Sequence, residues 1–292
     1  MATRRHGPRP VFERLYRRFK RAPLPWLARL RRWVIGEHAS AVLVDSANGL
    51  LLTPVSDFYI GRKLAQRGAF DARTVEHLSQ LVKADADVLF VGAHIGAFLV
   101  PIARHCRSVV GVEANPATFR LLELNVIVNR LSNVELFNLA ALDGDAAVRF
   151  VANKVNTGGS KVLAEHVDRP EFYFDDPDVV EVRGARLDDV LGGRSFDLIV
   201  IDVEGSEYRA LKGMPETLAR AGQVVIEFAP NLIDNVAGIT IEQFLAAVPE
   251  RFTSATLLGE ETSYDRRELS VFCNEIWANS YYDTPDLRFI SS

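Results

Sequence analysis

Residues 87–113 read DVLFVGAHIGAFLVPIARHCRSVVGVE, and this stretch decides the fold. It starts with a short apolar run, passes through a turn bounded by Gly92 and Gly96 into a helical pattern, and ends in a second apolar run that closes on Glu113. Strand, glycine turn, helix and strand in this order are typical of two parallel strands joined by a crossover helix. Glycine lets a ligand approach the backbone, and the start of a helix offers unpaired N–H groups. The stretch therefore predicts a ligand-binding turn at the end of a strand.

The same alternation of strand and helix patterns continues along the rest of the chain. Apolar runs predict strands at 87–91, 108–113, 134–139, 197–202, 223–228, 252–257 and 269–274, with helices at 97–105, 116–130, 206–220 and 240–248. We therefore expect an α/β fold with a seven-stranded, mostly parallel sheet and helices on both faces. Ligands bind such sheets outside the carboxyl ends of the strands, so the residues that end strands are the candidates for a site.

Four segments are expected from the pattern. They are a basic helical extension over 1–36, a lead-in segment over 37–83 with two short strands and a helix, the sheet domain over 84–280, and a C-terminal tail over 281–292. The stretch 153–180 is the one long irregular insertion in the expected sheet region, and long loops in compact domains are often functional.

Composition excludes several classes of protein. The chain has 292 residues, 48% of them hydrophobic, and two cysteines, which excludes collagen, low-complexity disorder and disulfide-stapled scaffolds. Cys106 and Cys273 lie in apolar contexts typical of buried thiols in a reducing compartment, so a cytoplasmic location is expected. The longest uncharged stretch, residues 88–103, is shorter than the roughly 18 residues of a membrane-spanning helix, and none is predicted.

The amino terminus differs in charge from the rest. Residues 1–36 hold eleven Lys and Arg against one acid, whereas the remainder holds 23 basic and 37 acidic residues. Two basic amphipathic helices are predicted here, at about 10–23 and 26–34. Two interpretations stay open: either both helices pack their apolar faces on the body, or the segment binds an anionic membrane surface or a phosphate-rich polymer.

Glu113 lies about twenty residues beyond the glycine turn, at the end of the second expected strand. An acid at this place can accept hydrogen bonds from both hydroxyls of a ribose. The turn and the acid together predict a cofactor that contains a nucleoside.

Later motifs separate this chain from dinucleotide dehydrogenases. They are VVGVEANPATF (109–119), NLAALDGD (138–145), LDDV (187–190), IDVEGSE (201–207) followed by ALKGM, and VVIEF (224–228). With the glycine turn and the lead-in DFYIGRKLAQRGAFDARTVEHL (57–78), these resemble the FkbM-type family of S-adenosylmethionine-dependent methyltransferases. The resemblance spans about Asp57 to Phe228 and does not cover residues 1–36.

The resemblance implies a class I methyltransferase fold, S-adenosylmethionine as cofactor, and roles for particular residues. The turn would cradle the methionine end of the cofactor, Glu113 its ribose, and the residues after the second and third strands its adenosine. The implied cofactor-binding residues are Gly92, Ala93, His94, Gly96, Glu113, Ala114, Asn115, Ala140, Ala141 and Asp202.

The glycine turn departs from the family pattern D-x-G-A-N-x-G at two positions. Phe90 replaces the acid that usually helps to position the cofactor's amino group, and His94 replaces the asparagine. Either a neighbouring residue substitutes for the acid, or the cofactor binds weakly or not at all.

Methyl transfer to a hydroxyl requires alignment of donor and acceptor and a base that removes a proton. Three catalytic candidates follow: Asp202 and Glu204, which emerge at the end of the fourth strand, and His94 in the turn. For His94 the alternative is a turn residue whose ring bonds to local backbone.

The insertion predicts the acceptor side of the site. Its NTGGSK stretch (156–161) lacks the spacing of a phosphate-binding loop, and we expect Asn156, Ser160 and Lys161 to contact the acceptor. Glu227, at the end of the fifth strand, either faces the acceptor or forms a structural salt bridge. Because nothing fixes the geometry of the acidic cluster that includes His166, Asp168 and Asp175, no metal site is predicted.

The sequence therefore predicts an O-methyltransferase acting on a sugar, a glycan or a small-molecule natural product. Nucleic acid is a less favoured acceptor, because the D/N-P-P-Y/F motif for exocyclic amines is missing. The alternative from another class is a non-catalytic scaffold that keeps the methyltransferase fold, which Phe90 supports. Acceptor identity and oligomeric state do not follow from the sequence.

Overall fold

The computed structural model of the chain describes residues 24–163, 175–279 and 284–291. The basic helix expected at 10–23, and His166 and Asp168 of the acidic cluster, lie outside the described residues.

A large mixed sheet forms the centre of the fold. Its eight strands lie in the order β13-β12-β14-β11-β10-β3-β4-β5. Five neighbouring strands are parallel, whereas β14 runs antiparallel to both of its neighbours. The bounds are β3 (Asp87–Val91), β4 (Ser108–Glu113), β5 (Val134–Asn138), β10 (Leu198–Ile201), β11 (Gln223–Glu227), β12 (Phe252–Leu257), β13 (Ser263–Asp265) and β14 (Asp286–Ser291). The expected α/β architecture is confirmed, with eight strands in place of seven.

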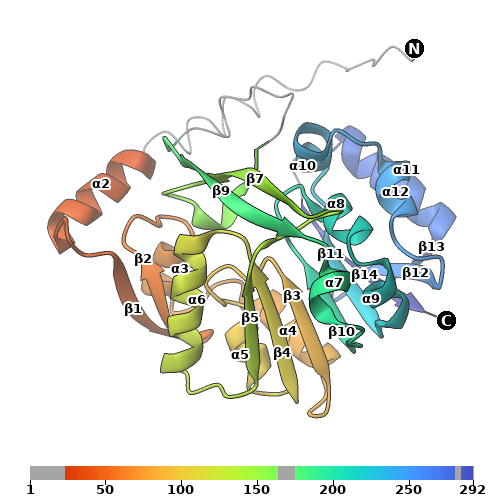
Figure 1. The fold of residues 1–292 in the computed structure, drawn as a ribbon, viewed down its shortest axis with the longest axis horizontal. Coiled ribbons are helices and arrows are strands. Elements are labelled where there is room, and N and C mark those ends of the chain that lie inside the picture. The colour runs from red at the N-terminus through yellow and green to blue at the C-terminus, as the bar shows by residue number, and fades with distance from the viewer. Residues whose placement is uncertain (1–23, 164–174, 280–283, 292) are drawn as a thin grey trace.

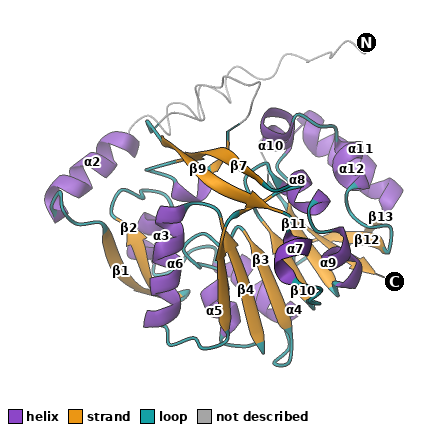
Figure 2. Ribbon diagram, in the orientation of Figure 1, coloured by secondary structure: helices purple, strands orange, loops and turns teal. Residues whose placement is uncertain are grey.

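Alternation along the strands sends apolar side chains to both faces of this sheet, and helices cover each face (Figure 2). In β3, Leu89 and Val91 join one buried cluster, while Val88 and Phe90 join the other. The first cluster is covered by α7 (Leu187–Leu191), α8 (Glu207–Lys212), α9 (Pro215–Arg220), α11 (Ile241–Ala246) and α12 (Arg266–Asn279). The second is covered by α3 (Ile60–Arg67), α4 (Ala72–Leu81), α5 (Leu99–Ala103) and α6 (Pro116–Val128).

A smaller sheet lies at the carboxyl end of the large one, because its first strand starts just after β5 ends. Its order is β6-β9-β7-β8, with bounds Ala140–Ala141 for β6, Ala146–Ala152 for β7, Lys161–Val162 for β8 and Asp178–Ala185 for β9. Figure 1 shows β7 and β9 across the upper end of the large sheet. The insertion expected to be irregular over 153–180 therefore follows directly on β7 and ends inside β9, which pairs with β7, and the short helix η1 (Thr157–Gly159) lies between these two strands.

The lead-in segment forms an antiparallel hairpin of β1 (Ala41–Ser46) and β2 (Gly49–Pro54), as expected. Two asparagines of α6 dock this hairpin. Asn125 accepts from the Leu52 N–H at 2.6 Å and donates to the carbonyls of Leu52 and Ile95. Asn129 makes the same pair of bonds to the N–H and carbonyl of Leu50. The amide side chains thus bond to the strand as a neighbouring strand would.

The helix α2 (Leu24–Ile35) confirms the second basic amphipathic helix, but most of its apolar residues do not pack on the body. Ala28 is buried, whereas the side chains of Trp26 and Trp33 are 64% and 79% exposed. Leu30 and Val34 are also exposed, and helical spacing places them on the same side as the two tryptophans. The packing interpretation therefore fails for this helix within the described part of the chain.

The strand predicted at 269–274 is wrong, because these residues lie in α12. Leu269 and Cys273 are buried at helical spacing, and Asp265 with Glu268 forms a capping box at the helix start. The strand that completes the sheet is β14, in residues expected to be a C-terminal tail. Its Leu287 and Phe289 are buried between β11 and β12.

The single helix expected at 206–220 is divided into α8 and α9. A Cβ on Gly213 would collide with the Leu142 carbonyl, and Pro215 starts the second helix. Asp188 accepts hydrogen bonds from the N–H groups of Glu216 and Thr217 and so caps α9. Between β11 and α11 lie the short helices α10 (Pro230–Leu232) and η3 (Ile233–Ala237).

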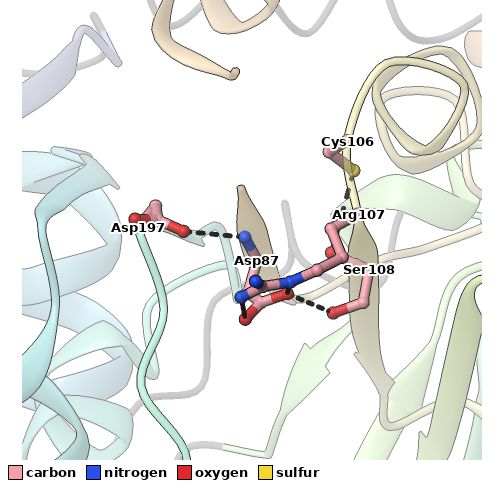
Figure 3. Close-up of polar contacts among 5 residues, drawn as sticks. All are labelled: Asp87, Cys106, Arg107, Ser108 and Asp197. Carbon is pink, nitrogen blue, oxygen red and sulfur yellow. Dashed lines mark hydrogen bonds and ion pairs between the residues drawn. The ribbon is translucent and has the colours of Figure 1, made fainter. Parts of the chain in front are cut away.

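A polar network joins the amino ends of the central strands, at the edge opposite the small sheet (Figure 3). Asp87 accepts hydrogen bonds from the side chains of Arg107 and Ser108, and its own N–H donates to Asp197 at 2.8 Å. The Arg107 guanidinium lowers the pKa of Asp87. Cys106 lies beside this network, with its thiol directed to the Ser108 carbonyl.

Candidate functional site

The glycine turn between β3 and α5 touches the ends of two neighbouring strands. Gly92 has φ +93°, and a Cβ at this position would collide with the carbonyl oxygen of Asp202 at the end of β10. The N–H groups of Gly92 and Ala93 both donate to the Val112 carbonyl of β4 at 2.9 Å. Gly96 also has a positive φ of +88°. The turn therefore needs glycine at both ends and is fixed against β4 and β10.

Glu113 is connected directly to this turn. Its side chain is 8% exposed, and its two carboxylate oxygens accept one backbone N–H each, from His94 and Asn115, both at 2.9 Å. Burial raises the pKa of Glu113 to about 7, although the two backbone hydrogen bonds act in the opposite direction. Because a carboxylate oxygen accepts more than one hydrogen bond, each oxygen keeps capacity for a further donor.

The residues expected near the adenosine lie around this acid. Asn115 caps α6 by accepting from the Ala117 N–H, and Asn138 donates to the carbonyls of Glu113 and Ala114. Ala140 and Ala141 are buried in β6, where they pair with β9. The structure thus places both alanines just beyond β5, close in sequence to the Asn138 contact.

Acidic residues gather at the ends of β10 and β11. Burial raises the pKa of Asp202 well above its usual value, and the negative charges of Glu204 and Asp286 add to this effect. Burial and the Asp202 charge likewise raise the pKa of Glu227. A side-chain hydrogen bond between Asp202 and Glu227 acts in the opposite direction for Asp202. A hydrogen bond between two carboxyl groups needs a proton on one of them, and the raised pKa values favour such a shared proton over two neighbouring negative charges.

Glu227 does not form the structural salt bridge that was one of its two interpretations. Among the described residues no Lys or Arg forms an ion pair with Glu227 or Asp202, and the Glu227 Oε2 atom is buried without a hydrogen bond. In the part of the chain that the structure describes, the charged groups that shift the pKa values of these two residues are all acidic.

Glu207 is a residue that the sequence reasoning missed. Its buried carboxylate accepts hydrogen bonds from the N–H groups of Val203 and Gly205 at 3.0 to 3.1 Å, and burial raises its pKa to about 7. These bonds hold the turn in which Glu204 has φ +52° and Gly205 has φ +100°. The acid at the start of a helix after a strand was the signal that could have identified it.

His94 has a side-chain partner, not the local backbone partner of the alternative interpretation. Its Nε2 atom lies 2.8 Å from the Thr157 hydroxyl, which comes from η1 in the insertion. The Thr157 hydroxyl also donates to Asp57, a fully buried carboxylate just before α3. Burial lowers the pKa of His94 to about 4, while the negative charge of Asp57 opposes this change. Asp57 and Thr157 were not among the predicted site residues.

The three insertion residues expected to contact the acceptor build the turn that carries Thr157. The Ser160 hydroxyl donates to the Thr157 carbonyl at 2.7 Å and accepts from the Asn153 N–H. Lys161 is buried, and its ammonium group donates to the Gly159 carbonyl. The Asn156 carbonyl accepts from the Gly159 N–H at 3.0 Å. The structure thus brings this loop to His94 through Thr157, and leaves their predicted contact with an acceptor untested.

Phe90 is 3% exposed and belongs to the buried cluster under α3, α4 and α5. It acts as a core residue on that face.

Among the described residues, no group of three or more His, Cys, Asp and Glu side chains is arranged to hold a metal ion. The same residues contain no helix of the length and apolarity that crossing a membrane requires.

Comparison with known proteins identifies one family and several partial relatives. The sequence model of the family described as methyltransferase FkbM domain matches residues 91–255. The 23S rRNA (uracil(1939)-C(5))-methyltransferase RlmD of Legionella pneumophila (strain Corby) is 42% identical over 77 residues, which are 26% of this chain and 16% of that protein. This chain therefore matches only a small part of the length of such curated relatives.

Solved structures with a similar fold share little sequence with this chain. Methyltransferase FkbM from Methylobacillus flagellatus KT is 17% identical, with a TM-score of 0.42 and coverage of 71% of this chain and 44% of that one. M. jannaschii TYW2 in complex with AdoMet is 12% identical, with a TM-score of 0.42 and coverage of 87% and 88%.

Proposed function

The chain belongs to the FkbM methyltransferase family, and from that premise we propose that it transfers a methyl group from S-adenosylmethionine to a hydroxyl of a sugar, a glycan or a small molecule. S-adenosylmethionine is the cofactor of this family. The observation that carries the proposal is the hydrogen bond of 2.9 Å between the His94 N–H and Glu113 Oε2. It joins the glycine turn to the acid that suits a ribose, so one ligand can reach both.

The chemistry of the available groups fits this cofactor. A ribose offers two neighbouring hydroxyl donors, and the Glu113 carboxylate oxygens have capacity for both. The cofactor also carries a sulfonium and an ammonium group. The surroundings of Asp202 and Glu227 are acidic, and Glu227 Oε2 is buried without a donor, which suits a cationic ligand.

We assign the cofactor contacts to the carboxyl edge of β3, β4 and β10. The turn would hold the methionine end, Glu113 the ribose, and the residues after β4 and β5 the adenosine. The assigned residues are Gly92, Ala93, His94, Gly96, Glu113, Ala114, Asn115, Ala140, Ala141 and Asp202. When bound, the cofactor supplies an electrophilic methyl group on sulfur.

The chain itself must orient the acceptor hydroxyl and remove its proton. Asp202, Glu204 and His94 are the proposed catalytic residues. Because Asp202 is hydrogen-bonded to Glu227 and the pKa values of both carboxyls are raised, Asp202 serves better to orient the acceptor by hydrogen bonds than to take its proton. His94 stays neutral at that pH and keeps a nitrogen lone pair, so it is the base in this proposal.

The acceptor would lie between the ends of β10 and β11 and the insertion. Glu227 supports this placement through its unpaired oxygen. Asn156, Ser160 and Lys161 are proposed to contact the acceptor from the other side, although the side chains of Ser160 and Lys161 already bond to the turn around η1.

Isothermal titration with S-adenosylmethionine and S-adenosylhomocysteine tests the cofactor site. We expect binding that weakens about tenfold or more in Glu113→Ala, because the ribose loses its acceptor. Glu123→Ala, an exposed acid on α6, is the matched control and should bind as the natural protein does. Absence of binding by the natural protein would instead favour the scaffold alternative that Phe90 suggested.

A methyl-transfer assay with labelled cofactor then separates the acceptor classes. Sugars, oligosaccharides and hydroxylated small molecules form one arm, and RNA forms the other, because the partial relative RlmD acts on 23S rRNA by its name. Product that resists mild base, with mass increased by one methyl group, is expected in the first arm. Transfer to RNA alone would contradict the proposed acceptor.

We further propose that residues 1–36 hold the enzyme at an anionic membrane surface on the cytoplasmic side or near a lipid-linked acceptor. The exposed apolar stripe of Trp26, Leu30, Trp33 and Val34 on α2 supports this, since Arg29 and Arg32 flank it and are exposed as well. An amphipathic helix with tryptophan and arginine in this arrangement binds lipid interfaces.

Co-sedimentation with vesicles tests the membrane partner. The full chain should bind phosphatidylglycerol vesicles and release them as salt rises, because each basic residue near the surface contributes about 1 kcal/mol. The double variant Trp26→Ala, Trp33→Ala should bind less, whereas Val271→Ala, an exposed apolar residue on α12, should bind normally. Equal binding by all three proteins would end the membrane proposal.

A further inference from the structure

A fully buried carboxylate, Asp57, lies in the lead-in segment and receives four hydrogen bonds. Its Oδ1 accepts from the N–H groups of Tyr59 at 2.9 Å and Gly61 at 3.0 Å. Its Oδ2 accepts from the Thr157 N–H at 3.3 Å and from the Thr157 hydroxyl. With two donors at each oxygen, Asp57 is an ionised acceptor that carries no proton of its own.

These contacts fix the direction of the hydrogen bond between Thr157 and His94. The Thr157 hydroxyl has one hydrogen, and Asp57 receives it. The same oxygen can then only accept from the His94 Nε2 atom at 2.8 Å, so that nitrogen carries the hydrogen. The other ring nitrogen, Nδ1, keeps its lone pair, and it makes no hydrogen bond to any residue that the structure describes.

Separate contacts hold the three segments together. The Phe58 N–H donates to the Val155 carbonyl at 2.8 Å, which ties the lead-in to the insertion. The Arg31 guanidinium donates to the Asp57 carbonyl at 3.0 Å, and the His94 N–H donates to Glu113. His94 is therefore fixed twice: its ring is held by Thr157 of the insertion, and its backbone N–H is held by Glu113 at the end of β4.

We propose that Asp57 and Thr157 are positioning residues that hold His94 as the neutral Nε2–H tautomer, so that Nδ1 takes the proton of the acceptor hydroxyl. The role rests on the proposed function. In the step, the acceptor O–H bond breaks and its proton bonds to Nδ1. The oxygen electron pair forms the bond to the methyl carbon, and the electrons of the carbon–sulfur bond stay on sulfur. The Asp57 charge then stabilises the imidazolium through Thr157.

Nitrogen-15 NMR of histidine-labelled protein reads the tautomer directly. The chain has six histidines, and the His94→Gln spectrum identifies the signals of His94. We expect the natural protein to show a neutral Nε2–H ring at pH 7. Thr157→Val should give a mixture of tautomers, and Thr157→Ser should restore the single one. Asp57→Asn should reverse the direction of these hydrogen bonds. The asparagine amide would donate to the Thr157 hydroxyl, the hydroxyl would donate to Nε2 of His94, and the ring hydrogen would then lie on Nδ1.

Kinetics and cofactor binding complete the test. We expect kcat to fall about tenfold or more in Thr157→Val and to recover in Thr157→Ser, with the Kd for S-adenosylmethionine unchanged. A single Nε2–H tautomer retained in Thr157→Val, an Nδ1–H ring in the natural protein, or an unchanged kcat after the tautomer shifts would each overturn the proposal. If Asp57→Asn does not fold, the two Thr157 variants decide. Failure of the natural protein to bind the cofactor would defeat the proposed function, whereas the NMR result would still report on the hydrogen-bond chain.

Discussion

Because Gly92 has no Cβ, the carbonyl of Asp202 can lie against the glycine turn. The close contact brings the ends of β3 and β10 together, and the positive φ at Gly92 and Gly96 turns the chain within five residues. The geometry of the whole candidate site depends on these two positions, because His94 and its bond to Glu113 lie between Gly92 and the start of α5.

Gly92→Ala should abolish cofactor binding. The new Cβ would collide with the Asp202 carbonyl, and alanine is strained at φ +93°. Titration calorimetry with S-adenosylmethionine measures the loss. Gly144→Ala is the matched control, because nothing lies within 4 Å of its Cβ position and it should bind normally. Binding by Gly92→Ala at natural affinity would show that the turn does not hold the cofactor.

The buried acids make stability fall as pH rises. Burial raises the pKa values of Glu113 and Glu207 to about 7 from an ordinary 4.5. The folded protein therefore binds more protons than the unfolded chain across this window, and stability present below the unfolded pKa is lost as pH rises through the folded one. We expect a lower urea midpoint at about pH 8 than at about pH 5.

Glu207→Gln isolates one part of this pH effect. Glutamine cannot ionise, so the difference in urea midpoint between the two pH values should shrink, and Glu123→Gln at an exposed position should leave it unchanged. An undiminished difference in Glu207→Gln would mean that this carboxyl titrates normally in the folded state.

At the scale of elements, α6 connects the lead-in hairpin to the glycine turn. Asn125 bonds to both backbone groups of Leu52 in β2 and to the carbonyl of Ile95 in the turn, and it is fully buried. A helix residue therefore transmits the position of the hairpin to the candidate site. The second link between the lead-in and the site is Asp57, through Thr157.

Asn125→Ala should destabilise the protein by about 2–4 kcal/mol, because three backbone groups lose their partner, the Ile95 carbonyl in a buried contact and the two groups of Leu52 in partly buried ones. Chemical denaturation measures the loss, and Glu123→Ala on the exposed side of α6 provides the control. A loss below about 0.5 kcal/mol would show that water or a shift of the hairpin replaces these bonds.

Across the whole molecule, the chain closes its sheet with its last described segment. The strand β14 lies between β11 and β12 and pairs with both, so contacts distant in sequence unite the two halves of the sheet. The helix α2, which carries the exposed apolar stripe, lies at the edge of this body, away from the large sheet (Figure 1). Stability and the proposed membrane contact therefore reside in different parts of the molecule.

Phe289→Ala should lower the free energy of unfolding by about 3–5 kcal/mol through the cavity left in the core. Thermal unfolding should show a Tm lower by several degrees, whereas Ser291→Ala on the same strand should change it little. An unchanged Tm in Phe289→Ala would mean that β14 contributes no packing to the sheet.

Local patterns in the sequence determined much of the fold. The strands from β3 to β12, the turn and Glu113 were predictable because each depends on residues close in the chain, and the helix α2 followed from its own periodicity. The prediction of a strand at 269–274 was wrong because an apolar run such as LSVFCN is compatible with a strand or a helix. The capping box of Asp265 and Glu268 just before it favours the helix.

Only the tertiary structure decided which residues complete the candidate site. Asp57, Thr157 and His94 lie 37 to 100 positions apart, and no periodicity links them before the segments pack. Likewise, β14 is a short apolar run whose place depends on pairing with β11 and β12. The sequence determined the turn because its positive φ angles require glycine at positions 92 and 96. It determined Glu113 because this acid is the last residue of a recognisable strand. The partner of the histidine required the packed fold, because hydrogen bonds between distant segments form only once burial excludes water.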